Sequence, residues 1–253
     1  MSTDNIKYLA KELKLGGIKN TIDDFLLEAI ANNYSVQDAI ELLLDSEFKI
    51  RRTNGISRRI RYARFPYKMH FEMFRSSHLS PDVVQEIKTL ETLSFVQEKS
   101  NVILIGNPGV GKTALSIAIG SKLCEEGGNV GFFNIPNLVI EMKEAMSLNQ
   151  LSNYKKKFEK LDLVILDDLG YCSFNRECGE VLFNLLTCRN EKGSMIITTN
   201  LTFDRWSEIF VDPVLTGAIV DRVAHRAHIV DMTGDSYRVL DTKSWASDRK
   251  QSS

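Results

Sequence analysis

The sequence predicts an α/β protein in which a parallel sheet is flanked by helices and preceded by a small all-α domain. From residue 101 onward, short apolar segments alternate with amphipathic ones, which is the pattern of βαβ units. The first fifty residues contain helix-capping patterns followed by apolar runs. A chain of 253 residues has room for one α/β domain and a small second domain. We therefore expect a helical domain with a basic linker at residues 1–75 and the α/β domain at residues 76–253.

The composition excludes several other classes of protein. Hydrophobic residues make up 43% of the chain and charged residues 26%, which is ordinary for a globular protein. The longest apolar runs, at 102–105 and 163–166, are far shorter than the roughly 18 residues that a membrane span needs. The N-terminus mixes Asp, Glu and Lys where a secretory signal has an uninterrupted apolar stretch. We expect a cytoplasmic protein with no membrane segment.

Capping and breaker residues divide the N-terminal part into helices. The pattern [ST]xx[DE] occurs at 21–24 and at 35–38, each time before an apolar run, and predicts two helix starts. The pair Asn-Gly at 54–55 predicts an interruption of the helix that follows, and Pro66 predicts its end. Pro81, after a serine, predicts the start of another helix.

The α/β part is predicted element by element. The expected strands are 101–106, 130–135, 161–168 and 194–200. The expected helices lie near 112–126, 137–146, 150–160, 176–190 and 212–226, and a final strand pair is expected around Gly234.

A phosphate-binding loop is the clearest functional motif. The segment GNPGVGKT follows the pattern GxxxxGK[ST] and lies between an apolar strand and a helix, where that motif belongs. Its glycines let main-chain N–H groups turn toward phosphates, and the next helix directs its positive end at them. Lys112 is expected to bind the β and γ phosphates, and Thr113 to ligate Mg²⁺. The predicted nucleotide-binding residues are Gly106, Asn107, Pro108, Gly109, Val110, Gly111, Lys112 and Thr113.

Polar residues at the ends of two strands complete the predicted site. The apolar run before Asp167 and Asp168 predicts a buried strand that delivers two carboxylates to the ligand-binding edge of the sheet. We expect Asp167 to hold Mg²⁺ through water and Asp168 to act as general base toward the attacking water. Asn200 ends the next strand and is expected to sense the γ-phosphate. The alternatives are a turn or helix cap for the acids and a loop cap for Asn200.

Hydrolysis of a triphosphate also calls for an arginine that stabilises the transition state. Arg222, in a helical stretch after the last core strand, is the predicted finger, at a place that a neighbouring subunit could use. Arg226 and Arg205 are weaker candidates. The alternative is an exposed ion pair of Arg222 with Asp221 or with another nearby carboxylate.

The charge is unevenly distributed along the chain. The window 49–71 contains eight cations and no acid, so it carries +8 and the remainder −9 for a net charge of −1. Four aromatic residues interleave with these cations, which favours nucleic-acid binding over a solvated linker helix. The predicted DNA-binding residues are Arg51, Arg52, Arg58, Arg59, Arg61, Arg64 and Lys68.

In this order, GNPGVGKT, LVILDDLGY, TTN and the pair DR at 221–222 resemble the IstB/DnaC-like AAA+ ATPases. The segment SRRIRYARFPYKMHFEMF resembles the arginine-rich block that precedes the ATPase core in IstB transposition helper proteins, and GDSYR at 234–238 resembles the end of that core. The resemblance implies a AAA+ P-loop NTPase core with strand order 5-1-4-3-2. It also implies head-to-tail, ATP-dependent assembly on DNA, with Arg222 acting on the next subunit's nucleotide.

Two departures from the family pattern change what is expected. Most AAA+ proteins have Glu where this chain has Asp168, and a shorter base implies slow hydrolysis. Little chain follows Arg238, so we expect no helical lid. Arg238 is the candidate for a second sensor residue.

The predicted function is a slow, DNA- or partner-stimulated ATPase that uses ATP and Mg²⁺, forms homo-oligomers on double-stranded DNA, and recruits and stimulates a transposase. A DnaC-like loader of a replicative helicase is the alternative within the same family. A nucleotide-gated DNA-binding scaffold without hydrolysis is an alternative of another class. A small-molecule kinase would leave the basic window and the residues Asp167, Asp168 and Asn200 unexplained.

Overall fold

The computed structural model describes residues 3–189, 192–234 and 236. It divides into two compact units, residues 1–58 and residues 59–253. The segment after residue 58, which the sequence analysis placed with the N-terminal domain up to residue 75, packs within the second unit. Its apolar side chains, among them Ala63 and Phe65, belong to the core of that unit.

The first unit is helical, as the sequence predicts. It contains helix α1 (Asp4–Glu12), helix α2 (Gly16–Ala31) and the start of helix α3 (Val36–Ala63). A small core of Ala10, Ile18 and Ile22 holds these helices together. The predicted cap at 35–38 is confirmed, since the main-chain N–H of Asp38 donates to Ser35 Oγ at 3.1 Å.

Two predictions for this region are wrong. Helix α2 does not start at the pattern 21–24 but at Gly16, because the buried carboxylate of Glu47 accepts the N–H of Ile18 at 2.9 Å near the helix start. Thr21 lies inside the helix, where its hydroxyl donates to the Gly17 carbonyl. Helix α3 also runs through 54–55 without interruption, since one Gly costs an otherwise favourable helix only about 1 kcal/mol.

The end of helix α3 is as predicted. The helix ends at Ala63, and Arg64 follows in the left-handed conformation with φ 61°. Pro66 cannot continue a helix, and it restricts the residue before it to extended conformations.

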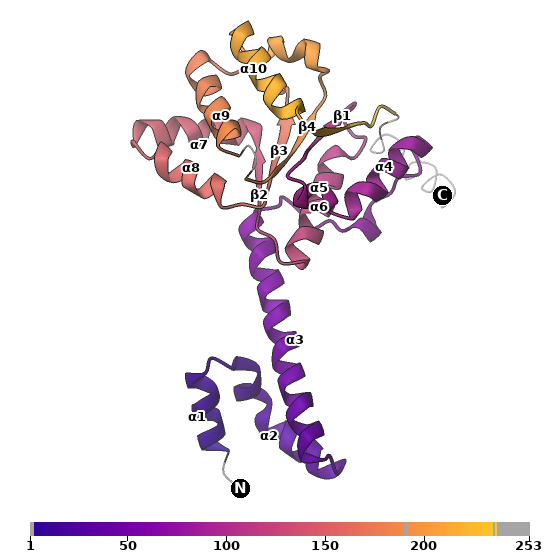
Figure 1. Ribbon diagram of the computed structural model, residues 1–253, viewed down its shortest axis with the longest axis vertical. Coiled ribbons are helices and arrows are strands. Elements are labelled where there is room, and N and C mark those ends of the chain that lie inside the picture. Colours follow the sequence, from indigo (N-terminus) through magenta and orange to yellow (C-terminus); the bar gives the residue numbers. More distant parts are fainter. Residues whose placement is uncertain (1–2, 190–191, 235, 237–253) are drawn as a thin grey trace, which may run out of the picture. The chain divides into compact units, whose positions relative to one another are not determined.

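The second unit contains a parallel sheet whose strand order is β2-β3-β4-β1-β5 (Figure 1). This confirms the predicted order, with β4 between β1 and β3. The strands are β1 (Asn101–Ile105), β2 (Val130–Asn134), β3 (Leu163–Leu169), β4 (Ser194–Thr199) and β5 (Ala227–Asp231). Strand β5 pairs in parallel with β1. The second member of the predicted final pair, after Gly234, and the proposed sensor Arg238 lie outside the described residues.

The helices of this unit begin and end within two residues of their predicted positions in the α/β part. They are α4 (Pro81–Glu91), α5 (Ser94–Gln97), α6 (Lys112–Glu125), α7 (Ile135–Ser147), α8 (Leu151–Glu159), α9 (Arg176–Arg189) and α10 (Pro213–Ala224), with short 3₁₀ turns at Phe71–Met73 and Phe203–Glu208. Within the described part of the chain, no helix is long and apolar enough to cross a bilayer.

Successive side chains of each strand point to opposite faces of the sheet, and each face has its own hydrophobic core. Ile103 and Ile197 face a core that includes residues of α7, α8, α9 and α10. Val102 and Ile196, one residue earlier on the same strands, face a core that includes residues of α4, α5 and α6. Successive side chains of a strand point to opposite faces, so buried strands with apolar residues throughout produce a helix–sheet–helix sandwich. The carboxyl ends of all five strands therefore share one edge.

Candidate nucleotide-binding site

The predicted phosphate loop connects β1 to α6 at this edge. Gly109 and Gly111 have φ of 88° and 98°, conformations that residues with a side chain rarely adopt. A Cβ at Gly109 would lie 2.2 Å from Ser236 Oγ, and one at Gly111 would lie 3.1 Å from the ring of Phe74. The loop is thus a close turn in which the left-handed main chain favours glycine at both positions and a side chain would crowd its neighbours.

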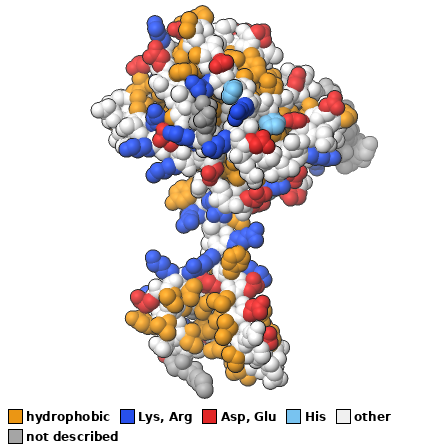
Figure 2. All heavy atoms as spheres, viewed as in Figure 1, with side chains coloured by type: hydrophobic (Ala, Val, Ile, Leu, Met, Phe, Trp, Pro, Cys, Tyr) orange, Lys and Arg blue, Asp and Glu red, His pale blue; other side chains and the backbone are white. Residues whose placement is uncertain are grey.

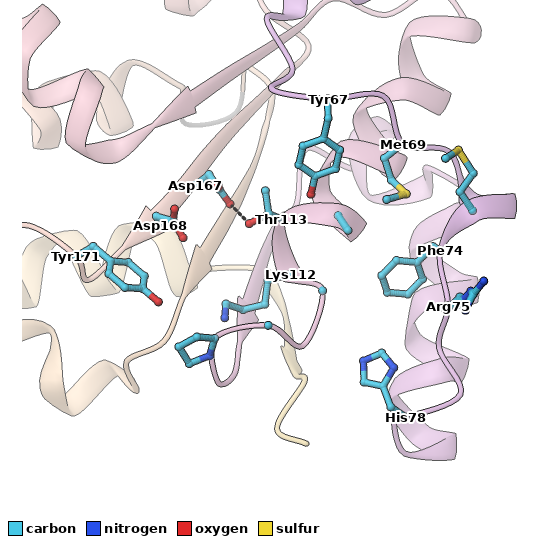
Figure 3. A pocket seen from close by; sticks show the side chains of 15 residues that line it. Tyr67, Met69, Phe74, Arg75, His78, Lys112, Thr113, Asp167, Asp168 and Tyr171 are labelled. Atoms are coloured by element: carbon cyan, nitrogen blue, oxygen red, sulfur yellow. Dashed lines mark hydrogen bonds between the residues drawn. The ribbon is translucent and has the colours of Figure 1, made fainter. Parts of the chain in front are cut away.

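Lys112 and Thr113 open helix α6 and point toward the loop and strand β3. The buried Lys112 ammonium donates to the carbonyls of Gly106 and Asn107 at 2.7 and 2.9 Å, so it spans the inside of the loop. The hydroxyl of Thr113 donates to Asp167 Oδ1 at 2.9 Å, the contact drawn in Figure 3. Two motifs that lie 54 residues apart in the sequence thereby meet at one point.

Asp167 is 3% exposed, at the carboxyl end of β3. Its Oδ1 also accepts a hydrogen bond of 2.7 Å from the hydroxyl of Thr198 on β4. Burial raises the pKa of Asp167 above its ordinary value, against the opposing effect of the Thr198 hydrogen bond. Hydroxyl and carboxylate oxygens are ligands that suit Mg²⁺, so Thr113 and Asp167 fit a magnesium ion at this point.

Asp168 has a different environment from its neighbour. Its main chain is left-handed, with φ 64°, and its N–H donates to Thr198 Oγ1 at 2.9 Å. Its carboxylate accepts a bond of 3.3 Å from the side-chain amide of Asn134, at the end of β2. Asn134 was not among the predicted site residues, although it lies in the predicted strand 130–135 and ends β2 at the same edge of the sheet as Asn200.

Asn200 directly follows β4, at the predicted edge. Its Oδ1 is buried and has no hydrogen-bond partner among the described residues. This oxygen lies against Gly170, since a Cβ there would come within 2.5 Å of it. Buried amide oxygens are normally paired, so the Asn200 amide is available to a donor from a ligand or water. Asn200 does not itself line the cavity described next.

A cavity of about 710 Å³ opens beside the loop. On one side lie Lys112, Thr113, Asp167, Asp168 and Tyr171 (Figure 3). The opposite wall comes from the segment that precedes α4 and contains Tyr67, Met69, Met73, Phe74, Arg75 and His78. His78 Nε2 lies 3.0 Å from the Val110 carbonyl, which ties this wall to the phosphate loop.

The second wall was missed as part of the site. Its aromatic and sulfur-containing side chains form an apolar surface of the kind that holds a planar base. Of the four aromatic residues in the basic window, only Tyr67 lines this wall, and the interpretation of those residues as part of a nucleic-acid site does not account for it.

Arg222 is not brought to the loop of its own chain. It lines a cavity together with Asn101, the first residue of β1, whereas the phosphate loop follows the last residue of β1. Strand β1 has five residues, so its first and last residues lie about 13 Å apart. Arg205, a weaker candidate, is engaged with Glu208 at 2.7 and 2.9 Å.

Two of the predicted DNA-binding cations have hydrogen-bond partners within the chain. Arg51 Nε, on an exposed side chain, donates to Glu47 at 2.8 Å, and Arg59 Nε donates to the Cys124 carbonyl at 2.7 Å. Five exposed cations have no hydrogen bond to another described side chain or carbonyl: Arg52, Arg58, Arg61, Arg64 and Lys68. Figure 2 shows Lys and Arg side chains along the helix labelled α3 in Figure 1.

The parallel sheet with its central β4 strand, the phosphate loop, and the paired acids define a P-loop ATPase of the AAA+ class. Residues 8–246 match the family model described as IstB-like ATP binding protein, and the chain belongs to that family.

Relatives and solved structures agree with this class. The chain is 32% identical over 239 residues to the insertion sequence IS21 putative ATP-binding protein of Pseudomonas aeruginosa, covering 94% of this chain and 90% of the relative. It is also 32% identical to the IS232 putative ATP-binding protein of Bacillus thuringiensis subsp. berliner, covering 94% of each. The crystal structure of the DnaC helicase loader matches with TM-score 0.52 and 20% identity over 68% of this chain and 98% of that one. The crystal structure of DnaI matches with TM-score 0.56 and 22% identity over 67% and 90%. At these identities the two structures show the fold alone.

Proposed function

We propose that this protein is an ATP-hydrolysing helper of DNA transposition, which assembles on target DNA in its ATP-bound form and recruits and stimulates a transposase. The observation that carries the ATPase part is the 2.9 Å contact between Thr113 and Asp167, beside a loop whose N–H groups can face phosphates. Family membership and relatives that are named as insertion-sequence ATP-binding proteins support the transposition part.

Each residue of the site has one task in the proposed reaction. The loop from Gly106 to Gly111 binds the phosphates, and Lys112 places its charge on the β and γ groups. Thr113 and Asp167 hold Mg²⁺, which when bound neutralises charge on those groups. Water attacks the γ-phosphorus, its proton passes to Asp168, and the bond to the ADP oxygen breaks. Asn200 orients the water.

Arg222 completes the site of the neighbouring protomer. It lies about a strand length from the loop of its own chain, so it is proposed to act in trans in a head-to-tail oligomer. Hydrolysis then depends on assembly, because each nucleotide lies between two chains.

Duplex DNA is proposed to bind the basic window. If each of the five exposed cations neutralises one phosphate, the logarithm of affinity falls with the logarithm of salt concentration with a slope of about −4.5. Arg51 and Arg59, which were also predicted to bind DNA, have intramolecular partners that this role would have to replace.

The test is nucleotide-dependent assembly on duplex DNA, measured by sedimentation and imaged by electron microscopy with a non-hydrolysable ATP analogue. The wild-type chain should assemble only with nucleotide, Lys112→Ala should bind the analogue about 100-fold more weakly and fail to assemble, and Lys122→Ala, later on the same helix, should behave as wild type. A chain that stays monomeric and ignores DNA with every nucleotide overturns the proposal.

A second experiment separates the two partners. The assembled protein is offered a transposase of an insertion sequence from the same cell and, separately, the replicative helicase of that cell. Retention of the transposase supports the proposal, and retention of the helicase alone identifies the protein as a helicase loader.

A further inference from the structure

A second cavity, of about 310 Å³, lies at the opposite edge of the sheet from the phosphate loop, where β1 and β4 begin. The charged and titratable side chains that line it are Glu98, Lys99, Arg189, Arg222, His225 and Arg226. Four of these are cations at neutral pH and one is an acid. None of Lys99, Arg222 and Arg226 forms an ion pair with another described residue. The cavity therefore presents a local excess of positive charge in a chain whose net charge is −1.

The side chain of Asn101 connects the end of α10, which carries Arg222, to the sheet by hydrogen bonds. The buried Asn101 donates through Nδ2 to the Val223 carbonyl at 3.2 Å and accepts through Oδ1 from the N–H of Met195 at 3.1 Å. Its main-chain N–H donates to the Arg226 carbonyl at 3.2 Å. The end of α10 is thus tied to both β1 and β4, which limits the movement of Arg222 and Arg226.

Two of the cations occupy left-handed main-chain positions. Lys99 has φ 55° and Arg226 has φ 50°. Glycine makes such turns without the steric cost that a side chain adds. Each comes two residues after a helix ends, where a left-handed residue is common, and each of these turns places a cation at the same cavity.

The floor of the cavity adds a buried charge. Arg189 is 0% exposed, and its guanidinium nitrogens donate to main-chain carbonyls, including those of Phe158 at 2.9 Å and Ser194 at 3.1 Å. Its Nε has no hydrogen-bond partner among the described residues. Since carbonyl oxygens carry no net charge, these bonds leave the positive charge of Arg189 uncompensated beneath the cavity.

We propose that Lys99 and Arg226, together with Arg222, form a binding site for the triphosphate of the ATP held by the neighbouring protomer. This inference rests on the proposed function, because it takes the trans position of Arg222 as given and adds two residues and a positioning role for Asn101. Phosphate oxygens are the ligands that a cluster of separate cations recognises. The nucleotide is favoured over a DNA phosphate because Arg222 lies in the same cavity.

The left-handed positions supply variants that remove the charge without disturbing the fold. Arg226→Gly and Lys99→Gly replace strained residues by the one residue that adopts this conformation freely. Lys14→Gly is the matched control, because Lys14 has φ 57° and belongs to the first unit, whereas every residue that lines the cavity belongs to the second.

The variants are assayed as full chains, by ATP hydrolysis in assemblies on duplex DNA and by affinity of the isolated protomer for a non-hydrolysable ATP analogue. Arg226→Gly and Lys99→Gly should each lower hydrolysis at least about 10-fold, while the affinity of the isolated protomer stays unchanged. Mixing either glycine variant with Lys112→Ala should restore activity. In the mixed assembly the glycine variant supplies an intact phosphate loop, and the neighbouring Lys112→Ala chain supplies an intact cavity. Lys14→Gly should match wild type throughout.

Three other results overturn the inference in distinguishable ways. If Arg222→Ala loses hydrolysis while both glycine variants match wild type, the two cations have no such role and the proposed function stands. If Arg222→Ala also matches wild type, the trans arrangement itself fails. If the glycine variants weaken DNA binding without nucleotide and reduce its salt dependence, the ligand of the cavity is a DNA phosphate.

Discussion

The side-chain amide of Asn134 donates a hydrogen bond of 3.3 Å to the carboxylate of Asp168. The two residues lie on the adjacent strands β2 and β3, and β2 pairs Asn134 directly with Asp167 in the parallel register. Because Asp168 has a left-handed main chain, its side chain leaves the strand in an unusual direction, and the bond to Asn134 holds it there. Asn134 is therefore a positioning residue for the proposed general base.

Asn134→Ala should lower kcat about 10-fold and leave ATP affinity unchanged, because it removes an orienting bond and no phosphate contact. Asn134→Asp should lower kcat further, because the new carboxylate has no N–H to donate and repels the carboxylate of Asp168. Steady-state kinetics of both variants measure these effects. An unchanged kcat in Asn134→Ala would mean that the bond has no part in turnover.

Asp167→Asn should abolish Mg²⁺-dependent hydrolysis, a loss of about two orders of magnitude or more, and should stabilise the fold at pH 7. Burial, the foremost cause, raises the pKa of Asp167 in the folded protein. Ionisation of the buried carboxylate therefore costs stability. The cost is absent below the unfolded-state pKa of about 3.9, grows as the pH rises to the folded-state pKa, and is complete above it.

The measurement for Asp167 is urea unfolding of wild type and Asp167→Asn at several pH values. The asparagine variant should gain stability over wild type as the pH rises from 3 to 7. Asp204→Asn, at an exposed position, is the control and should show no such gain. A destabilised Asp167→Asn at pH 7 would contradict the prediction.

Arg222→Ala should spare ATP binding and lose about 10³-fold or more of the hydrolysis rate in the assembled state. Mixed with Lys112→Ala, it should regain part of the activity, since one chain supplies the loop and the other the arginine. The measurement is phosphate release across mixing ratios, with subunit incorporation checked in the same sample. Absence of rescue in assemblies that contain both chains would exclude Arg222 as the trans residue.

Arg189→Met should destabilise the second unit by about 3 kcal/mol or more, because four main-chain carbonyls lose their donor at once. These carbonyls belong to Phe158, Leu161, Asp162 and Ser194. Arg176→Met, on the exposed face of the same helix, should change stability by about 0.5 kcal/mol or less. The urea midpoint of each variant is the measurement, and equal midpoints would show that the bonds to Arg189 are replaceable.

Local sequence patterns predicted the helices and strands of the second unit because the hydrophobic pattern of each segment matches its burial in the structure. The apolar runs of β3 and β4 are buried throughout, and that of β1 is buried except at Ile105, as expected for a parallel sheet covered on both faces. The pattern at 21–24 failed because a threonine can bond to a carbonyl within its own helix, and capping by Glu47 comes from a residue far along the chain. That contact has no local signal.

By itself, the sequence determined the phosphate loop, the two acids at the carboxyl end of β3 and the order in which strands and helices follow one another, since each depends on residues adjacent in the chain. Only the tertiary structure decided that Thr198 would link Asp167 and Asp168, that Asn134 would hold Asp168, that residues 67–78 would form the second wall of the cavity, and that Arg222 would lie with Lys99 and Arg226 at the far edge. The physical reason is that hydrogen bonds and cavities depend on distances between strands and segments, and these distances are set by sheet register and packing rather than by position in the sequence.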